Sequence, residues 1–283
     1  MSPHHTVQRN PPGAIRLALP GGGRDYLREA GALQELLRQG IAPVELAGVS
    51  AGAIVACAYA LHLPGKGDLR QLVLDTVPHP NGHLERDLWP FGDRPGLYKG
   101  KPMEEAFASV FKPRLGDARI PVHIVTVCLS DERQRIFSSA DDPEAPTAKV
   151  VRASSAAWPY FHTVDIGNKT YADGGFVTNN PLDDPRWKRT DLPLWGFKLQ
   201  RPAPSGAPVK GLTGHLGALL SSMISANERE DEADIQHVQV PLRSEGDSFD
   251  LEFGLKLAAR MFEQGAEDVR RFLDDHYPDR DAA

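Results

Sequence analysis

Short apolar runs alternate with amphipathic segments along the first part of the chain, and this alternation predicts strands followed by helices. Residues 14–20 form an apolar run typical of a buried strand and lead into three glycines. Residues 26–39 place leucines and alanines on one helical face and end at Gly40. Residues 44–49 predict a second strand, and residues 51–63 a second helix. This order favours an α/β fold with a mostly parallel sheet covered by helices.

The rest of the chain continues the pattern less regularly. Residues 77–100 carry four prolines and several glycines, which predicts a loop or broken structure. The Pro/Gly segment 201–211 is typical of a surface connection within one domain. We therefore expect a disordered tail at 1–13 and a single domain at 14–283. The further elements expected are helices at 102–111, 149–157, 212–234 and 251–275, and strands at 121–129, 135–137, 169–172, 191–199 and 238–242.

Composition narrows the class of protein. The chain has 283 residues, 41% of them hydrophobic, and a formal net charge of -6, which argues against binding nucleic acid through bulk electrostatics. The polar N-terminus lacks the apolar core of a secretory signal, and no apolar run is long enough to span a membrane. We expect a cytoplasmic protein. Export by a route that needs no secretory signal stays open. Cys57 and Cys128 are expected to be buried thiols.

The strongest chemical signal is the segment 48–52, Gly-Val-Ser-Ala-Gly, between the second strand and the second helix. Small residues on both sides of Ser50 allow a tight strand-to-helix turn that exposes the serine hydroxyl. The N–H groups that follow, beginning with that of Ala51, open a helix and favour nearby negative charge. The pattern predicts that Ser50 is a nucleophile.

Three glycines, Gly21 to Gly23, follow the first strand and can present backbone N–H groups to an oxyanion. A phosphate-binding loop would need Lys-Ser/Thr after the glycines, and a dinucleotide fingerprint would need glycine where Tyr26 stands. The oxyanion interpretation is preferred because Ser50 follows one helix and one strand later.

Asp173 precedes two glycines and follows the short strand expected at 169–172. An aspartate in such a turn can act as a base, although an Asp-Gly pair is also an ordinary turn. Neither motif decides the function by itself. Their order along the chain, glycine loop, serine turn and then Asp-Gly-Gly, is more specific.

With these stretches and with 152–157, Arg-Ala-Ser-Ser-Ala-Ala, the sequence resembles the patatin-like phospholipase family over roughly residues 14–275. The resemblance implies a three-layer α/β sandwich and a lipid-acyl hydrolase, of phospholipase A or lysophospholipase type, that uses a Ser-Asp dyad. It places the nucleophile at Ser50 and the base at Asp173. It implies an oxyanion hole at Gly21, Gly22 and Gly23 with the N–H of Arg24, a lipid substrate, and neither a cofactor nor a metal.

The chain departs from the family pattern just after the glycines. The family usually has one residue, a basic residue and a glycine there, whereas this chain has Arg24, Asp25 and Tyr26. The basic side chain comes one residue earlier here, at Arg24, or its role in fixing the loop is absent. This departure concerns the oxyanion donors and the level of activity rather than the fold.

Two other functions stay open. A Ser-His-Asp esterase or acyltransferase would need a histidine after the acid, and His215, His237 and His276 are the candidates. A catalytically weak lipid-binding regulatory module would keep the fold without the activity. The aromatic loop at 158–162 predicts substrate-lining residues or transient contact with a membrane surface, although local packing explains it equally well. These residues are Trp158, Tyr160, Phe161 and His162.

Overall fold

The structure is a computed structural model, and it describes residues 10–62, 69–75, 85–87, 95–202, 206, 208–231, 237–245 and 255–280. Most of the expected tail at 1–13 and most of the loop at 77–100 lie outside these residues. None of the helices in the described ranges combines the length and the apolarity needed to cross a bilayer.

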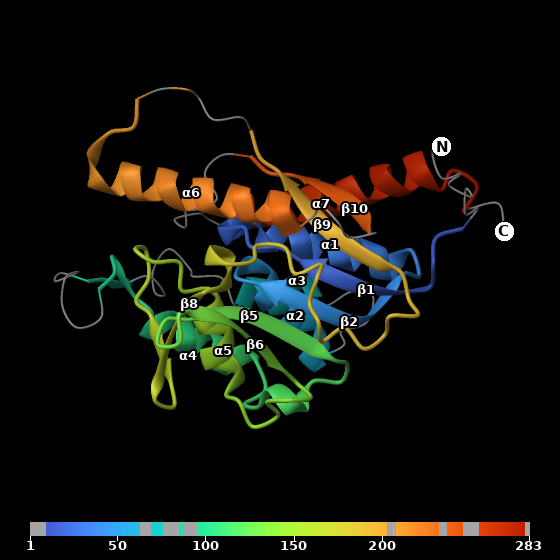
Figure 1. Ribbon diagram of the computed structural model, residues 1–283. Coiled ribbons are helices and arrows are strands. Elements are labelled where there is room, and N and C mark those ends of the chain that lie inside the picture. The colour runs from blue at the N-terminus through green and yellow to red at the C-terminus, as the bar shows by residue number, and fades with distance from the viewer. Residues whose placement is uncertain are drawn as a thin grey trace.

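An eight-stranded mixed sheet forms the centre of the molecule (Figure 1). Its main path runs β10-β9-β1-β2-β5-β8-β7, and β6 pairs with β5. The pairs from β10 to β5 are parallel, whereas β6, β7 and β8 pair in antiparallel fashion. The strands of this sheet are β1 (Ala14–Leu19), β2 (Ala42–Val49), β5 (Val122–Cys128), β6 (Arg133–Ser138), β7 (Val164–Ile166), β8 (Lys169–Asp173), β9 (Leu194–Gln200) and β10 (Val238–Arg243).

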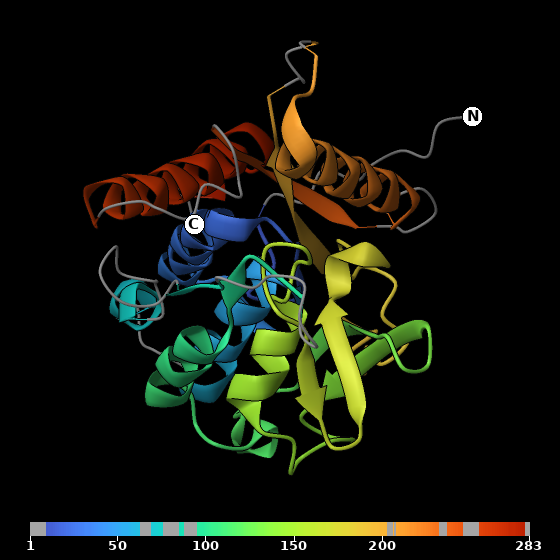
Figure 2. The ribbon, with the colours of Figure 1, turned by 90° about the vertical axis from the view of Figure 1, so that its left-hand side faces the viewer.

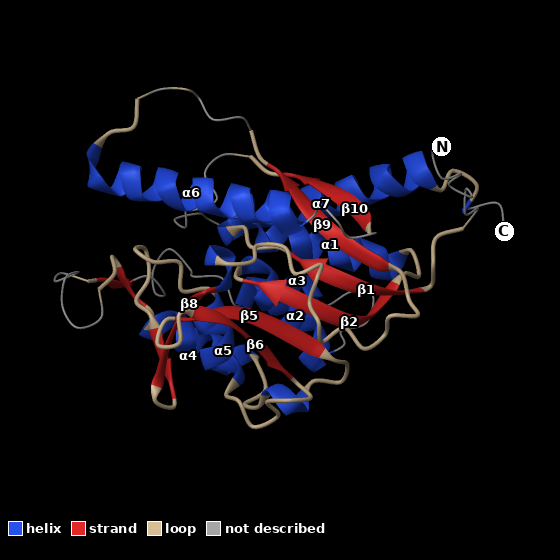
Figure 3. Cartoon of the chain, viewed as in Figure 1, coloured by secondary structure: helices blue, strands red, loops and turns tan. Residues whose placement is uncertain are grey.

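Helices flank this sheet, and Figure 3 shows them as blue elements against the red strands. They are α1 (Tyr26–Arg38), α2 (Ala51–His62), α3 (Leu69–Asp75), α4 (Lys101–Val110), α5 (Thr147–Ser154), α6 (Gly211–Asp231) and α7 (Leu255–His276). Short 3₁₀ helices are η1 (Gly23–Asp25), η2 (Leu115–Asp117) and η3 (Gly174–Phe176), and β3 (Glu85–Arg86) pairs with β4 (Tyr98–Lys99) in a separate hairpin. The expected α/β fold with a mostly parallel sheet is confirmed.

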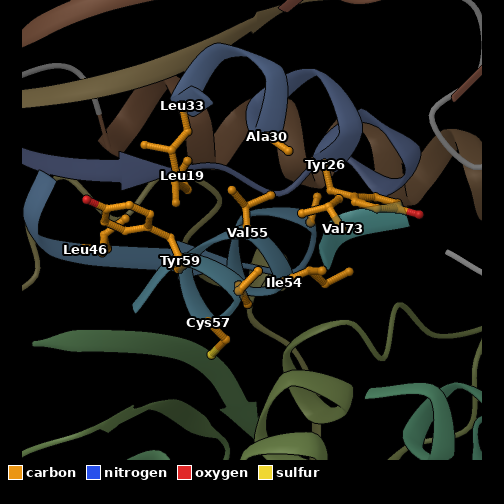
Figure 4. Packing of buried hydrophobic residues seen from close by; sticks show 14 of the residues in the cluster. Leu19, Tyr26, Ala30, Leu33, Leu46, Ile54, Val55, Cys57, Tyr59 and Val73 are labelled. Carbon is orange, nitrogen blue, oxygen red and sulfur yellow. The ribbon is translucent and has the colours of Figure 1, made fainter. Parts of the chain in front are cut away.

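Side chains that alternate along a strand point to opposite faces of the sheet and therefore join two separate hydrophobic clusters. Leu17 and Leu19 of β1 join the main hydrophobic cluster beneath the helices, whereas Ala18 joins a small cluster on the other face of the sheet. The second cluster includes Leu182 and Trp187 from the segment between η3 and β9. Figure 4 shows part of the main cluster, in which Tyr26, Leu33 and Val55 come from α1 and α2.

Helices α1 and α7 approach closely because each has a glycine at the contact. A Cβ atom on Gly31 would overlap the backbone carbonyl of Phe262, and one on Gly265 would overlap the carbonyl of Arg28. The apolar face of α7 therefore packs against α1, and α1 in turn fixes the glycine loop that precedes it.

Several expected boundaries need correction. The helix expected at 212–234 is α6, which ends at Asp231, and residues 232–236 lie outside the described part. The strand expected at 191–199 begins only at Leu194, and the helix expected at 149–157 is α5, already complete at Ser154. Helix α3 and strand β7 were not expected, because both are short and lack clear periodicity.

Candidate active site

Ser50 lies at the sharp turn between β2 and α2 and has a φ of 50°, in the left-handed region that non-glycine residues rarely adopt. The flanking glycines make this turn sterically feasible. A Cβ on Gly48 would lie 2.5 Å from the carbonyl oxygen of Gly52, and a Cβ on Gly52 would overlap the backbone of Leu19. The Gly-x-Ser-x-Gly spacing is thus required by close packing around the turn.

Side chains from α5 hold the backbone of Ser50 in place. The Ser50 N–H donates to Ser154 Oγ at 2.9 Å, and Ser154 Oγ donates in turn to the carbonyl of Val125 at 2.7 Å. Ser155 Oγ donates to the carbonyl of Ser50 at 3.3 Å. These bonds compensate for strain at Ser50, because a left-handed non-glycine residue persists only where its surroundings fix it.

The register of β5 brings Asp173 to Ser50. Val49, the residue before Ser50, pairs with Val125, and Asp173 pairs with Thr126, the next residue of β5. Strand β6 occupies the other edge of β5, so β2 and β8 share the same edge, end to end. Ser50 and Asp173 therefore meet where one strand stops and the other begins, and the Ser50 side chain forms a hydrogen bond with the Asp173 carboxyl.

Burial makes the Asp173 carboxyl a stronger base than an ordinary aspartate. Its side chain is only 5% exposed, and this desolvation raises its pKa to about 7. Three interactions oppose the rise without cancelling it: the Gly175 N–H donates to Asp173 Oδ1 at 2.8 Å, Ser50 donates a second hydrogen bond, and the charge of Arg152 favours the carboxylate. A carboxyl with this pKa can accept and return a proton near neutral pH.

The glycine loop runs beside Ser50, and Gly21 fixes its path. A Cβ on Gly21 would lie 3.4 Å from the Cβ of Ser50 and would also overlap the Asn179 side chain. The carbonyl of Gly21 accepts hydrogen bonds from Asn179 Nδ2 at 3.1 Å and Arg201 Nη2 at 3.0 Å. Gly23 has a φ of 56°, a conformation that glycine adopts without strain.

The expectation that Gly21 is an oxyanion donor needs correction, because its N–H already donates to the carbonyl of Asn179 at 3.0 Å. Within the described ranges, the N–H groups of Gly22, Gly23 and Ala51 donate none of the loop or cap hydrogen bonds. These three remain the candidate donors. The N–H of Arg24 stays a prediction.

The departure from the family pattern after the glycines is accommodated inside the protein. Asp25 is buried and accepts hydrogen bonds from Arg28 Nη1 and from Ser244 Oγ. Arg24 Nη2 donates to the carbonyl of Glu245 at 3.0 Å, and Tyr26 packs into the main core. A buried basic group is therefore present one turn later than expected, at Arg28.

The aromatic loop residues do not form one group. Trp158 is 42% exposed, whereas Phe161 is buried in the main core beneath the Arg152 guanidinium. Tyr160 lies against α6, where a Cβ on Gly217 would be 2.8 Å from its hydroxyl. His162 Nε2 lies 2.8 Å from Asp87 Oδ2. The prediction that these residues line a substrate groove is left open.

The histidine candidates of the rival triad lie elsewhere. His215 Nδ1 lies 2.6 Å from the carbonyl of Gly211, and His276 Nδ1 lies 2.9 Å from the carbonyl of Phe272, so both contact their own helices. His237 precedes β10 and lies near Gly196. The groups that shift the Asp173 pKa include no histidine. The described ranges also contain no cluster of three His, Cys, Asp or Glu side chains suited to a metal.

Three supporting residues were missed by reasoning from the sequence. Ser154 and Arg152 lie in the Arg-Ala-Ser-Ser-Ala-Ala stretch, which carries the family resemblance but no chemical pattern that assigns a role. Asn179, which holds Gly21, precedes the Asn-Pro pair and has no such pattern either. Hydrogen-bonding side chains that act on backbone groups far away in sequence leave no local signal.

The family model described as patatin-like phospholipase matches residues 17–186, more than half of the chain. An uncharacterized protein, R571, of Acanthamoeba polyphaga mimivirus is 27% identical over 180 residues, which cover 59% of this chain and 59% of that protein.

Two solved structures are similar to this chain at low sequence identity, and the first of them shares its fold. VipD from Legionella pneumophila is 14% identical, has a TM-score of 0.58, and is matched over 94% of this chain and 68% of its own. ExoU, in its heterodimeric complex with SpcU from the type III secretion system of Pseudomonas aeruginosa, is 14% identical with a TM-score of 0.40, over 95% of this chain and 53% of its own.

Proposed function

The chain belongs to the patatin-like phospholipase family, a family of lipid-acyl hydrolases, and on this premise we propose that it is a serine hydrolase of phospholipase A or lysophospholipase type. Ser50 is the nucleophile and Asp173 the base. The observation that carries the proposal is the meeting of the two side chains at the β2–β8 junction, with a hydrogen bond between them and a pKa of about 7 at Asp173.

In the proposed reaction, Asp173 accepts the Ser50 proton while Oγ attacks the carbonyl carbon of an acyl ester. The N–H groups of Gly22, Gly23 and Ala51 stabilise the resulting oxyanion. The carbon–oxygen bond to the alcohol then breaks, Asp173 returns its proton to that alcohol, and an acyl-serine remains. Asp173 then takes a proton from water, whose oxygen attacks the acyl carbon. The bond from that carbon to Ser50 Oγ breaks, Asp173 returns the proton to Oγ, and the fatty acid leaves.

The glycine loop supports this role because hydrogen bonds to its Gly21 carbonyl fix the direction of the N–H group that follows. The Gly21 carbonyl is held by Asn179 and Arg201. Since the carbonyl and the following N–H of a trans peptide point in opposite directions, the Gly22 N–H faces away from those two residues. This preorganisation means that the loop does not need to rearrange when charge develops on the substrate.

Turnover of p-nitrophenyl esters and of mixed phospholipids tests the dyad. We expect Ser50→Ala to reduce turnover to the background rate, and Asp173→Asn to reduce it about 10²- to 10⁴-fold, as loss of a general base does. Asp191→Asn, a matched change at an exposed aspartate, should leave turnover unchanged. Retained turnover in both dyad variants would exclude the mechanism, and a loss in His237→Ala as large as that in Ser50→Ala would favour the triad.

A further inference from the structure

A cavity of about 410 Å³ lies on the other side of α5 from the candidate active site. It opens between the start of α4, the helix α5 and strand β7, which lie side by side in Figure 2 as the green, yellow-green and yellow elements. Arg152 lines the cavity, whereas Ser154, which holds Ser50, is two residues further along α5 and roughly 200° around the helix. The same short helix thus faces both sites.

Arg152 is the central group of this cavity. Its side chain is 1% exposed and lies over the Phe161 ring. Nε donates to the carbonyl of Gly100 at 3.1 Å, and Nη2 donates to the carbonyl of His162 at 2.8 Å. Nη1 has no acceptor among the described residues. Burial lowers the pKa of Arg152 to about 10, so the guanidinium is still charged at neutral pH.

A buried, charged N–H group without an acceptor is costly, and such groups generally have a partner. Two neighbouring carbonyls already occupy the Nε/Nη2 edge of the guanidinium. A planar carboxylate therefore cannot use that edge for the usual paired hydrogen bonds. An anion with oxygens in several directions can instead accept from Nη1 and from other donors around the cavity at the same time.

Basic side chains supply these other donors. Lys99, Lys101 and Lys149 line the cavity together with Arg152, while the carboxylates at its wall are those of Glu104 and Asp165. Lys99 is held by Glu85, and Lys101 Nζ lies 3.7 Å from Glu105 Oε1.

Lys149 is exposed and forms no ion pair with any residue in the described ranges. The first turn of α4 adds the positive end of a helix at the same wall. Arg152 and Lys149 are thus the cations of this lining that form no ion pair with the described residues, although the chain as a whole is acidic.

We infer that this cavity, termed the Arg152 cavity, binds a phosphate group through Arg152 Nη1 and the Lys149 and Lys101 ammonium groups. The phosphate comes either from the head group of a phospholipid or from a free phosphate compound. The lipid source rests on the proposed function, whereas the site itself does not.

Calorimetric titration of the full chain with inorganic phosphate, in a buffer free of phosphate, tests the site. Ser50→Ala protein is used throughout, so the result does not depend on hydrolytic activity. We expect phosphate to bind and Lys149→Gln to weaken its binding roughly fivefold, the effect of one unit charge at contact distance in water. Lys210→Gln removes the same charge from an exposed position outside the cavity and should bind as the parent does.

The source is identified by competition. Vesicles of phosphatidylcholine containing phosphatidic acid displace inorganic phosphate if the ligand is a lipid head group, and vesicles of phosphatidylcholine alone serve as the reference. Displacement by glycerol phosphate but not by either vesicle identifies a free phosphate compound. Absence of phosphate binding, or equal binding by Lys149→Gln and Lys210→Gln, would overturn the inference. Because Lys149 is exposed, its substitution leaves the fold intact even where Arg152→Gln fails to fold.

Discussion

At the scale of single residues, the environment of Asp173 suits the carboxylate to the role of base that we propose for it. An aspartate in water has a pKa near 4 and is a weak base at neutral pH. Burial at the β2–β8 junction raises the pKa of Asp173 to about 7, and the Gly175 N–H and the charge of Arg152 keep it from rising further. The same side chain can therefore accept the serine proton and return it to the leaving group.

This pKa predicts the pH dependence of the reaction. The carboxylate is the active form, so kcat/KM for a p-nitrophenyl ester should rise about tenfold per pH unit below pH 7 and level off above it. The profile is measured as the rate of ester hydrolysis at a series of pH values, after the uncatalysed rate at each pH has been subtracted. An acid limb near pH 4, the ordinary value for aspartate, would contradict the account.

The motifs around Ser50 and Asp173 could be recognised in the sequence because their chemistry requires local neighbours. Glycines at 48 and 52 are needed by the turn itself, and Asp173 is followed by the glycine whose N–H it accepts. The bonds from Ser154 to Ser50 and from Asn179 to Gly21 could not be predicted, because they join segments more than a hundred residues apart. The hydrogen bond that occupies the Gly21 N–H joins the same two segments, because its acceptor is the backbone carbonyl of Asn179.

At the scale of elements, the close contact of α1 and α7 positions the glycine loop. We expect Gly31→Ala to lower the free energy of unfolding by about 1 to 3 kcal/mol, because the added Cβ meets a backbone carbonyl rather than a flexible side chain. Thermal and urea denaturation measure the change.

The matched control is Gly214→Ala in α6, where a Cβ would lie 3.3 Å from the Val209 side chain. Both substitutions place alanine in a helix interior and gain the same helix propensity. Gly214→Ala should therefore be neutral or stabilising. Equal stability changes in the two variants would show that α1 and α7 do not depend on this close approach.

Helix α6 extends along one side of the molecule (Figure 1) and contacts η3, the turn that follows Asp173. Asn227 Nδ2 donates to the carbonyl of Gly175, and Leu220, seven residues earlier on the same face, is buried. Leu219 and Met223, one turn apart on another face, are 62% and 47% exposed. The helix that contacts the Asp173 turn through Asn227 therefore also carries an exposed apolar strip, Leu219 and Met223.

We predict that this strip contacts the lipid surface. The double variant Leu219→Ser/Met223→Ser should lose about tenfold or more in turnover of phospholipid vesicles, because each exposed apolar side chain gains on the order of 1.5 kcal/mol when buried. Turnover of a soluble p-nitrophenyl ester should not change. Leu255→Ser, at a similarly exposed leucine of α7, is the control. Equal losses on both substrates would contradict a role at the surface.

The long, periodic elements could be predicted from the sequence, whereas the short ones could not. Apolar runs identified β1, β2 and β5, and the leucine pattern identified α1. Strand β7 has three residues, and α5 begins after Pro146 without a side-chain capping hydrogen bond.

At the scale of the whole molecule, the active-site geometry follows from the way the sheet changes direction. Parallel pairing from β10 to β5 places the glycine loop and Ser50 at neighbouring strand ends. The antiparallel pairing of β8 with the remainder of β5 then brings Asp173 to the same point. The sequence predicts most of the strands, but pairing direction and register arise from contacts across the whole sheet, and no local pattern encodes them.

We propose that Ser50 is a nucleophile activated by Asp173. Labelling with a fluorophosphonate, followed by mass-spectrometric mapping of the modified peptide, tests this proposal. We expect a single covalent adduct on Ser50 in the wild-type chain, much slower labelling in Asp173→Asn, and none in Ser50→Ala. Labelling that persists in Ser50→Ala, or an unlabelled wild-type chain that is fully folded, would contradict it.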